Sequence, residues 1–251
     1  MEIEIKGSQG KILGYVSQSS PKVKHAGQGS QMLILNFGLP IARPVVGTDL
    51  FHRELVERIA NQSGWTVLSM LYSGIDGSEG RFSPMNWCDD MMVAADYFVT
   101  SNQAKSVLIA GYDLAAAVCL YVAARSEAVR GVATISPLVD LSGFSAKPQL
   151  LSRKAQAVGV KVPSKSTEID LWTKQLQALD PAKSADLLGS KQWLVISGRD
   201  DEVVTDAELR EFLTVSGVTA EAHALTAGDH DLTSDPRMMA ILLGWMERNN
   251  N

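Results

Sequence analysis

The sequence has few of the features that mark several classes of protein. It has 2 cysteines in 251 residues, too few for a disulfide framework. No apolar run approaches the roughly 20 residues of a membrane-spanning helix. Its 23 Lys and Arg are outnumbered by 28 Asp and Glu, and no basic cluster stands out. We therefore expect no membrane partner and no nucleic-acid partner, because both need a positive surface or a long apolar segment.

The beginning of the chain also lacks the pattern of an export signal. Residues 1–6 alternate between apolar and charged side chains and include two glutamates, whereas a signal peptide has a basic region followed by a long apolar run. Cys88 and Cys119 fall within helical patterns, where a cysteine is typically a buried thiol rather than half of a disulfide. We expect a cytoplasmic protein.

What the sequence does contain is an alternation of strands and helices. Residues 1–16 predict an antiparallel hairpin with a turn over 7–10. Short apolar runs then predict buried strands, and helical spacing predicts the helices between them. The expected strands cover 32–35, 65–70, 106–110, 131–135, 193–196 and 220–224, and the expected helices cover 49–60, 87–99, 114–124, 206–215 and 237–248. This order predicts one α/β domain over 1–251, with a mostly parallel twisted sheet and helices on both faces.

Residues 140–181 interrupt this alternation. They are polar and contain two helical patterns. We interpret them as a small helical lid over the carboxyl ends of the strands, where open α/β sheets bind their ligands.

The first candidate catalytic residue lies in the segment Gly111-Tyr112-Asp113-Leu114-Ala115. It joins a buried strand to a helix through a sharp turn with small flanking residues, which is the context of the G-x-S-x-G nucleophile elbow. Here the central residue is Asp113 instead of serine. The alternative is that Asp113 only caps the following helix, because Asp is a favoured N-cap residue.

Two later loops could complete a catalytic site. Asp201 follows the expected strand 193–196 at a spacing that suits a triad acid, with Asp200 as the fallback. His230 lies between the last expected strand and the last helix, which suits the catalytic base. The order elbow, acid, histidine is that of a Ser-His-Asp hydrolase on this type of sheet.

The loop after the strand 32–35 is a candidate oxyanion hole. We expect Leu39, or else Gly38, to supply one backbone N–H, and Leu114, directly after Asp113, to supply the second. We also expect Tyr112 and the lid residue Trp172 to line the substrate site. No two histidines have metal-ligand spacing, so we expect no metal and no other cofactor, and the expected partner is a small-molecule substrate.

Taken together, these segments resemble the α/β-hydrolase superfamily from about Met32 to Arg248. The stretch from Gly80 through Trp87 and the end from Asp235 to Trp245 look like those of bacterial hydrolases of this fold. Asp113 at the elbow and Gly38-Leu39-Pro40 resemble the branch of haloalkane dehalogenases and epoxide hydrolases. That branch often has Trp after the nucleophile and Tyr in the lid, whereas this chain has Leu114 and a lid without Tyr.

Two functions fit this pattern. In the first, Asp113 is a carboxylate nucleophile, His230 is the base that activates water and Asp201 orients it, and the bond cleaved is an ester, an epoxide or a carbon–halide bond. A variant of this hypothesis uses Asp113 and His230 for acid–base work without a covalent intermediate. In the second, the domain is a non-catalytic ligand-binding or interaction protein on a degenerate hydrolase scaffold.

Overall fold

The computed structural model describes residues 1–18, 31–39, 50–101 and 103–250. One 8-stranded sheet forms its centre, with the strand order β1-β2-β4-β3-β5-β6-β7-β8. The strands are β1 (Glu2–Gly7), β2 (Gly10–Ser17), β3 (Met32–Asn36), β4 (Thr66–Leu71), β5 (Val107–Tyr112), β6 (Val129–Ile135), β7 (Gln192–Gly198) and β8 (Glu221–Leu225). β1 pairs with β2, and β2 with β4, in antiparallel fashion, and every later pair is parallel. The expected fold class and the N-terminal hairpin are confirmed.

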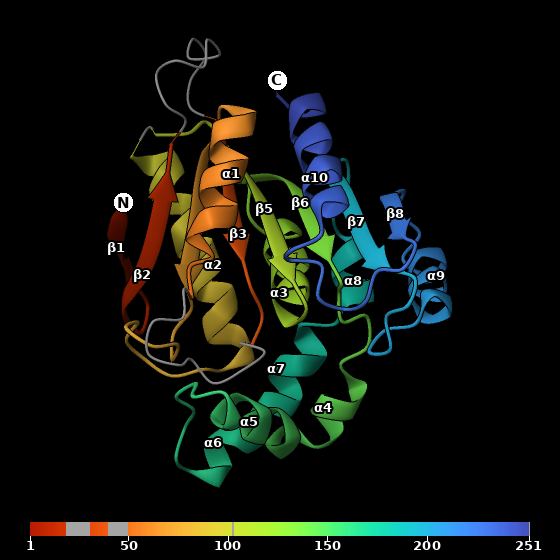
Figure 1. The fold of residues 1–251 in the computed structure, drawn as a ribbon. Coiled ribbons are helices and arrows are strands. Elements are labelled where there is room, and N and C mark those ends of the chain that lie inside the picture. Colours follow the sequence, from red (N-terminus) through yellow and green to blue (C-terminus); the bar gives the residue numbers. More distant parts are fainter. Residues whose placement is uncertain (19–30, 40–49, 102, 251) are drawn as a thin grey trace.

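The main helices form a layer on each face of the sheet (Figure 1). They are α1 (Arg53–Ser63), α2 (Pro84–Thr100), α3 (Leu114–Ala123), α8 (Pro181–Asp186), α9 (Asp206–Val215) and α10 (Pro236–Arg248). The buried side chains of α1 and α10 pack on one face, and those of α2, α3, α8 and α9 on the other. Because both faces are covered, the inner strands are mostly apolar, as the continuous runs in the sequence predict.

The first helix begins later than the sequence pattern indicates. It was expected over 49–60, and the structure places α1 at Arg53–Ser63, after His52 in a left-handed conformation with φ 48°. The expected start at Asp49 lies outside the described part of the chain, as does Pro40 of the expected oxyanion loop. The later start moves His52 off the helix and places its ring beside Phe37.

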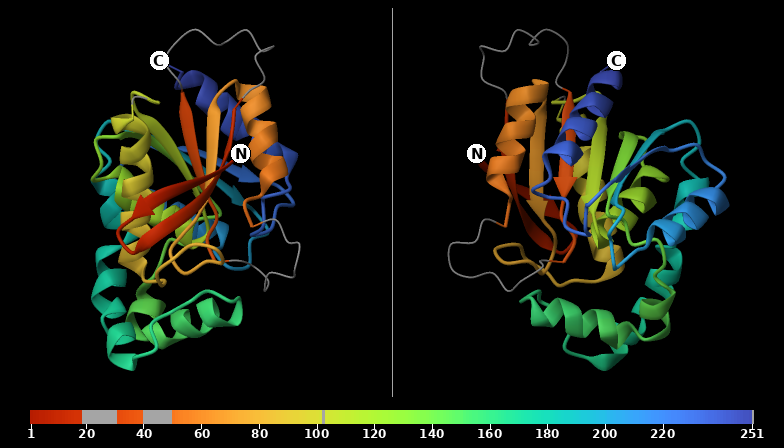
Figure 2. Two further views of the ribbon diagram at one scale, coloured as in Figure 1. Left: turned by 90° about the vertical axis from the view of Figure 1, so that its left-hand side faces the viewer. Right: turned by 45° about the vertical axis from the view of Figure 1, so that its right-hand side comes forward.

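The expected lid contains more helices than the two predicted from its pattern. Four short helices fill it: α4 (Ser142–Ala146), α5 (Pro148–Ala157), α6 (Ser166–Asp170) and α7 (Trp172–Ala178). Three of them have 5 to 7 residues, too few for a 3.6-residue period to stand out in sequence. Figures 1 and 2 show this group beyond the carboxyl ends of the parallel strands and the twist of the sheet above it.

The lid is fastened to the body of the protein through the loop after β4. The backbone N–H of Lys161 donates to the oxygen of Gly74 at 2.8 Å, and the N–H of Phe82 donates to the oxygen of Lys161 at 2.7 Å. Next to these two hydrogen bonds, Trp172 packs edge-on against the ring of Phe82, with the ring centroids 4.9 Å apart. Backbone hydrogen bonds and a buried aromatic contact together hold the lid segment against the loop.

Candidate active site

The turn between β5 and α3 is as tight as the elbow pattern predicts. A Cβ atom on Gly111 would stand 2.4 Å from the backbone oxygen of Ala115, so strand and helix approach at a distance that only glycine permits. Asp113 takes up the strain of the turn with φ 50° and ψ −124°. A non-glycine residue in this region costs roughly 1–3 kcal/mol and is typical of functional sites.

The Asp113 side chain does not cap α3. It occupies the N-cap position but makes no hydrogen bond to the first turn of the helix. Its oxygen Oδ1 lies 3.4 Å from Nε2 of His230. The carboxylate is therefore directed toward the histidine and away from the helix that it precedes.

The structure brings the three expected triad residues together. Nδ1 of His230 lies 2.8 Å from Oδ2 of Asp201, and the other carboxylate oxygen of Asp201 accepts the backbone N–H groups of Val203 at 2.8 Å and Val204 at 3.0 Å. These two donors fix the rotation of a carboxylate whose side chain is 1% exposed. Asp200, the fallback acid, is exposed, and its backbone N–H binds the oxygen of Gly228.

His230 sits between two carboxylates, and its electrostatics follow from that position. The hydrogen bond with Asp113 is the largest cause that raises the pKa of His230, to about 9. Asp201 contributes through its own hydrogen bond and charge, while partial burial acts in the opposite direction. At neutral pH the imidazole therefore carries a proton and forms an ion pair on each side. If Asp113 were esterified, one of these carboxylates would be neutral and the pKa of His230 would fall.

Gly38 and Leu114 flank the Asp113 carboxylate. A Cβ atom on Gly38 would lie 2.8 Å from Oδ2 of Asp113 and 3.1 Å from the backbone nitrogen of Leu114. The loop after β3 thus runs directly beside the elbow. Leu39, the next residue, is partly buried and packs against the core.

Tyr112 and Trp172 lie in packed surroundings on different sides of the molecule. Tyr112 points to the face covered by α10, and its hydroxyl donates to Sδ of Met238 at 3.3 Å. Trp172 is 1% exposed and belongs to the core on the α2 side. That they line the substrate site stays a prediction.

The sequence pattern does not indicate the role of two glycines in the site, Gly198 and Gly228. A Cβ atom on Gly198, the last residue of β7, would stand 2.2 Å from the oxygen of Gly228 and 2.3 Å from that of Asp229. The loop that carries His230 therefore lies directly on the end of the strand that leads to Asp201. The glycines themselves were visible, but nothing in the sequence indicates which distant backbone approaches them.

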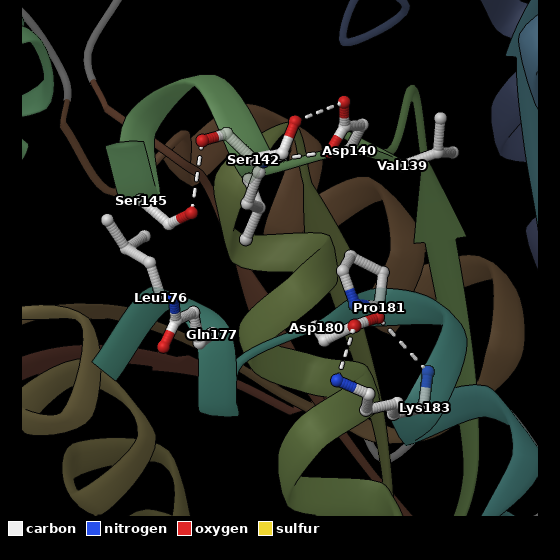
Figure 3. A pocket seen from close by; sticks show the side chains of 10 residues that line it. Val139, Asp140, Ser142, Ser145, Leu176, Gln177, Asp180, Pro181 and Lys183 are labelled. Carbon is white, nitrogen blue, oxygen red and sulfur yellow. Dashed lines mark hydrogen bonds and ion pairs between the residues drawn. The ribbon is translucent and has the colours of Figure 1, made fainter. Parts of the chain in front are cut away.

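A separate pocket of about 190 Å³ opens at the base of the lid. Figure 3 shows its lining, which comes from the segment after β6, from α4 and α7, and from the start of α8. Asp140 accepts from the N–H and hydroxyl of Ser142, and Asp180 pairs with Lys183 at 3.2 Å. None of the three triad residues lines this pocket.

The described ranges contain neither a metal-binding cluster nor a membrane-spanning helix. Within 1–18, 31–39, 50–101 and 103–250, no group of three His, Cys, Asp or Glu side chains is placed to hold a metal ion. Over the same residues, no helix is both long and apolar enough to cross a membrane. Cys88 and Cys119 are free and buried, as expected.

Comparison with known proteins identifies the fold. Neither a protein-family model nor a curated protein matches the chain. Among solved structures, an α/β serine hydrolase homologue from Coxiella burnetii is 15% identical with a TM-score of 0.66, and the match covers 99% of this chain and 96% of that one. An α/β serine hydrolase without a lid from Xanthomonas campestris is 19% identical with a TM-score of 0.62, over 99% and 92% of the two chains.

An esterase from Pyrococcus furiosus is similar over a comparable length. It is 15% identical with a TM-score of 0.70, and the match covers 99% of this chain and 90% of that one. At these identities the likeness concerns the fold and leaves the chemistry to the site. The protein has the α/β-hydrolase fold.

Proposed function

We propose that the protein is a hydrolase of small organic substrates in which Asp113 is a carboxylate nucleophile, His230 the base and Asp201 the residue that orients the base. One observation carries this proposal. The Asp113 carboxylate lies on a strained elbow, does not cap its helix, and faces a histidine whose far nitrogen binds a second, buried carboxylate. Strain of this kind persists where the surrounding structure maintains it, which is typical of catalytic positions.

The first half of the reaction forms a covalent ester. An oxygen of Asp113 attacks a saturated carbon of the substrate, a carbon–oxygen bond forms, and the bond to the leaving group breaks. The leaving group takes the electron pair as a halide ion or, when an epoxide ring opens, as an alkoxide that takes up the proton released by His230. Asp113 has become a neutral ester, so the pKa of His230 falls and its proton is released.

The second half hydrolyses the ester. Neutral His230 takes a proton from water as the water oxygen attacks the carbonyl carbon of the Asp113 ester. The oxyanion formed there is stabilised by backbone N–H groups of Leu114 and of the Gly38–Leu39 loop. The intermediate collapses and His230 returns the proton to the departing alcohol. The carboxylic acid left at Asp113 then passes its proton to His230, which regenerates the carboxylate and the charged histidine.

Trapping the ester tests this proposal. His230→Gln keeps a polar side chain but removes the base, so the ester should form and persist. The variant is incubated with esters, epoxides and alkyl halides, and the mass of the intact protein is measured by mass spectrometry. We expect an adduct that maps to the peptide containing Asp113 and is absent from the double variant with Asp113→Asn.

The same panel distinguishes the other functions. Turnover by the natural protein without an adduct in His230→Gln would favour acid–base chemistry without a covalent intermediate. An absence of both adduct and turnover across all three classes would overturn the hydrolase proposal in favour of a binding protein on this fold.

A further inference from the structure

Three aromatic rings form a stack beside the elbow. The ring of Phe37 lies nearly parallel to that of Tyr112, with centroids 4.9 Å apart and an interplanar angle of 17°. Its other face lies on His52, at 3.7 Å and 23°. Phe37 directly follows β3, Tyr112 is the last residue of β5, and His52 directly precedes α1.

The stack joins the two backbone segments that flank the Asp113 carboxylate. Phe37 immediately precedes Gly38, and Tyr112 immediately precedes Asp113 and Leu114. Gly38 lies so close to the elbow that its Cβ position is 3.1 Å from the nitrogen of Leu114. Stacked rings attract each other beyond the effect of their burial, and here that attraction depends on the two segments keeping their relative position.

The partner of Phe37 is itself fixed. Tyr112 is 5% exposed and its hydroxyl donates to Met238 in α10. Burial raises the pKa of the Tyr112 hydroxyl, so it stays protonated and remains a donor. The ring of Tyr112 therefore gives Phe37 a rigid surface against which the loop after β3 is held.

We infer that Phe37 is a positioning residue, which holds the Gly38–Leu39 donors of the oxyanion hole beside Asp113 through its stacking on Tyr112 and His52. This inference rests on the proposed function, because the oxyanion arises only when water attacks the Asp113 ester. The alkylation step disperses the carboxylate charge and creates no oxyanion at this position. Loss of the stack should therefore slow ester hydrolysis and spare ester formation.

Phe37→Leu tests the inference with His230 intact. Removal of one oxyanion donor typically lowers kcat by about 10²–10³-fold, so a displaced donor should lower kcat by roughly 10–100-fold. Because kcat/KM reports the steps up to ester formation, KM should fall in parallel and kcat/KM should stay within about twofold. The alkyl-Asp113 ester should accumulate during turnover, and Phe37→Tyr should restore hydrolysis.

A matched variant separates positioning from lost stability. Phe212 in α9 is a buried ring that also contacts an aromatic partner, Trp193, with centroids 5.8 Å apart. Phe212→Leu should lower the melting temperature without ester accumulation. A Phe37→Leu protein that accumulates no ester, or that loses kcat/KM along with kcat, would overturn the inference.

Hydrogen–deuterium exchange tests the same inference without a substrate. Exchange in the peptide that covers residues 36–39 should rise in Phe37→Leu and stay unchanged in Phe212→Leu. Unchanged exchange in Phe37→Leu would contradict the positioning role. Failure of the proposed function is a separate outcome, because it would appear as the absence of any adduct in His230→Gln with Phe37 in place.

Discussion

Gly198 and Gly228 are in backbone contact, and this contact holds the two halves of the Asp201–His230 pair together. A Cβ atom on Gly198 would stand 2.2 Å from the oxygen of Gly228, a separation that no side chain tolerates. Asp201 follows Gly198 by three residues, and His230 follows Gly228 by two. Their 2.8 Å hydrogen bond therefore depends on the close approach of the two loops.

Gly198→Ala should separate these loops. The added methyl group meets two rigid backbone oxygens, so the loops must move, at a cost of about 1–3 kcal/mol in unfolding free energy. A shift of about 1 Å at a catalytic group can lower activity by about 10²-fold. Urea unfolding and kcat measure the two effects, with Gly143→Ala as the control because a Cβ there meets nothing within 4 Å. Equal behaviour of both variants would contradict the contact.

Gly38→Ala should act on the proposed nucleophile, Asp113, itself. A methyl group at this position would lie 2.8 Å from Oδ2 of Asp113, so the carboxylate has to turn away from its present orientation. In the His230→Gln background we expect the rate of ester formation to fall by roughly 10²-fold. The rate is followed by the growth of the adduct mass. This result differs from that of Phe37→Leu, which should leave ester formation intact. An unaltered rate would show that Gly38 does not restrain the Asp113 carboxylate.

The charge of His230 predicts a pH dependence. Its pKa in the folded protein is raised to about 9 from 6.5, so the folded state binds the proton more tightly than the unfolded state. The resulting stabilisation is fully present below about pH 6.5 and is lost as the pH rises through about 9. As the pH rises from about 6.5 to about 9, the unfolding free energy of the wild type should fall more than that of Asp113→Asn. The reason is that Asp113→Asn removes the largest cause of the raised His230 pKa.

Nuclear magnetic resonance titration measures the same quantity directly. The chain has 4 histidines, and the resonance of His230 is the one that disappears in His230→Gln. We expect its titration midpoint to fall in Asp113→Asn and also in Asp201→Asn. A midpoint near the ordinary histidine value in the wild-type protein would show that the two carboxylates do not hold the proton.

Asp90 predicts a second dependence of the same sign in the acid range. This buried carboxylate accepts the N–H of Ser73 at 2.7 Å and its hydroxyl at 3.0 Å, and burial raises its pKa to about 6 from 3.8. A raised carboxyl pKa stabilises the folded state at low pH, and this contribution is lost as the pH rises from about 4 to about 6.

Asp90→Asn should remove that loss, since an amide can still bind both groups of Ser73. The stability of the wild type relative to Asp90→Asn should therefore fall by about 3 kcal/mol over this interval. Urea unfolding at a series of pH values measures the difference. Asp96→Asn, an exposed change on the same helix, should follow the wild type, and parallel curves for wild type and Asp90→Asn would refute the prediction.

Much of the fold was predictable because its signals are local. The apolar runs of the inner strands and the spacing of α9 follow from residues within one element, and α9 begins and ends at Asp206 and Val215, as expected. The start of α1 and the number of lid helices were not predictable in this way. His52 adopts a left-handed conformation that its sequence does not require, and the helices of the lid are too short to display a period.

The same distinction between local and long-range signals applies to the candidate site. Asp113, Asp201 and His230 could be identified because each follows a strand whose carboxyl end faces the same edge of a parallel sheet. The contacts that adjust their geometry could not be identified. The Gly198–Gly228 approach and the Phe37–Tyr112 stack join residues from separate strands, and only the assembled sheet brings them together.

The most direct test of the nucleophile is a single turnover in H₂¹⁸O with enzyme in excess over a substrate found in the adduct panel. Water attacks the carbonyl carbon of the Asp113 ester in the proposed mechanism, so the product oxygen comes from the protein. We predict that the product of the first turnover contains ¹⁶O and that the peptide containing Asp113 gains one ¹⁸O. Product that carries ¹⁸O, with an unlabelled Asp113 peptide, would mean that water attacks the substrate directly and would contradict the account.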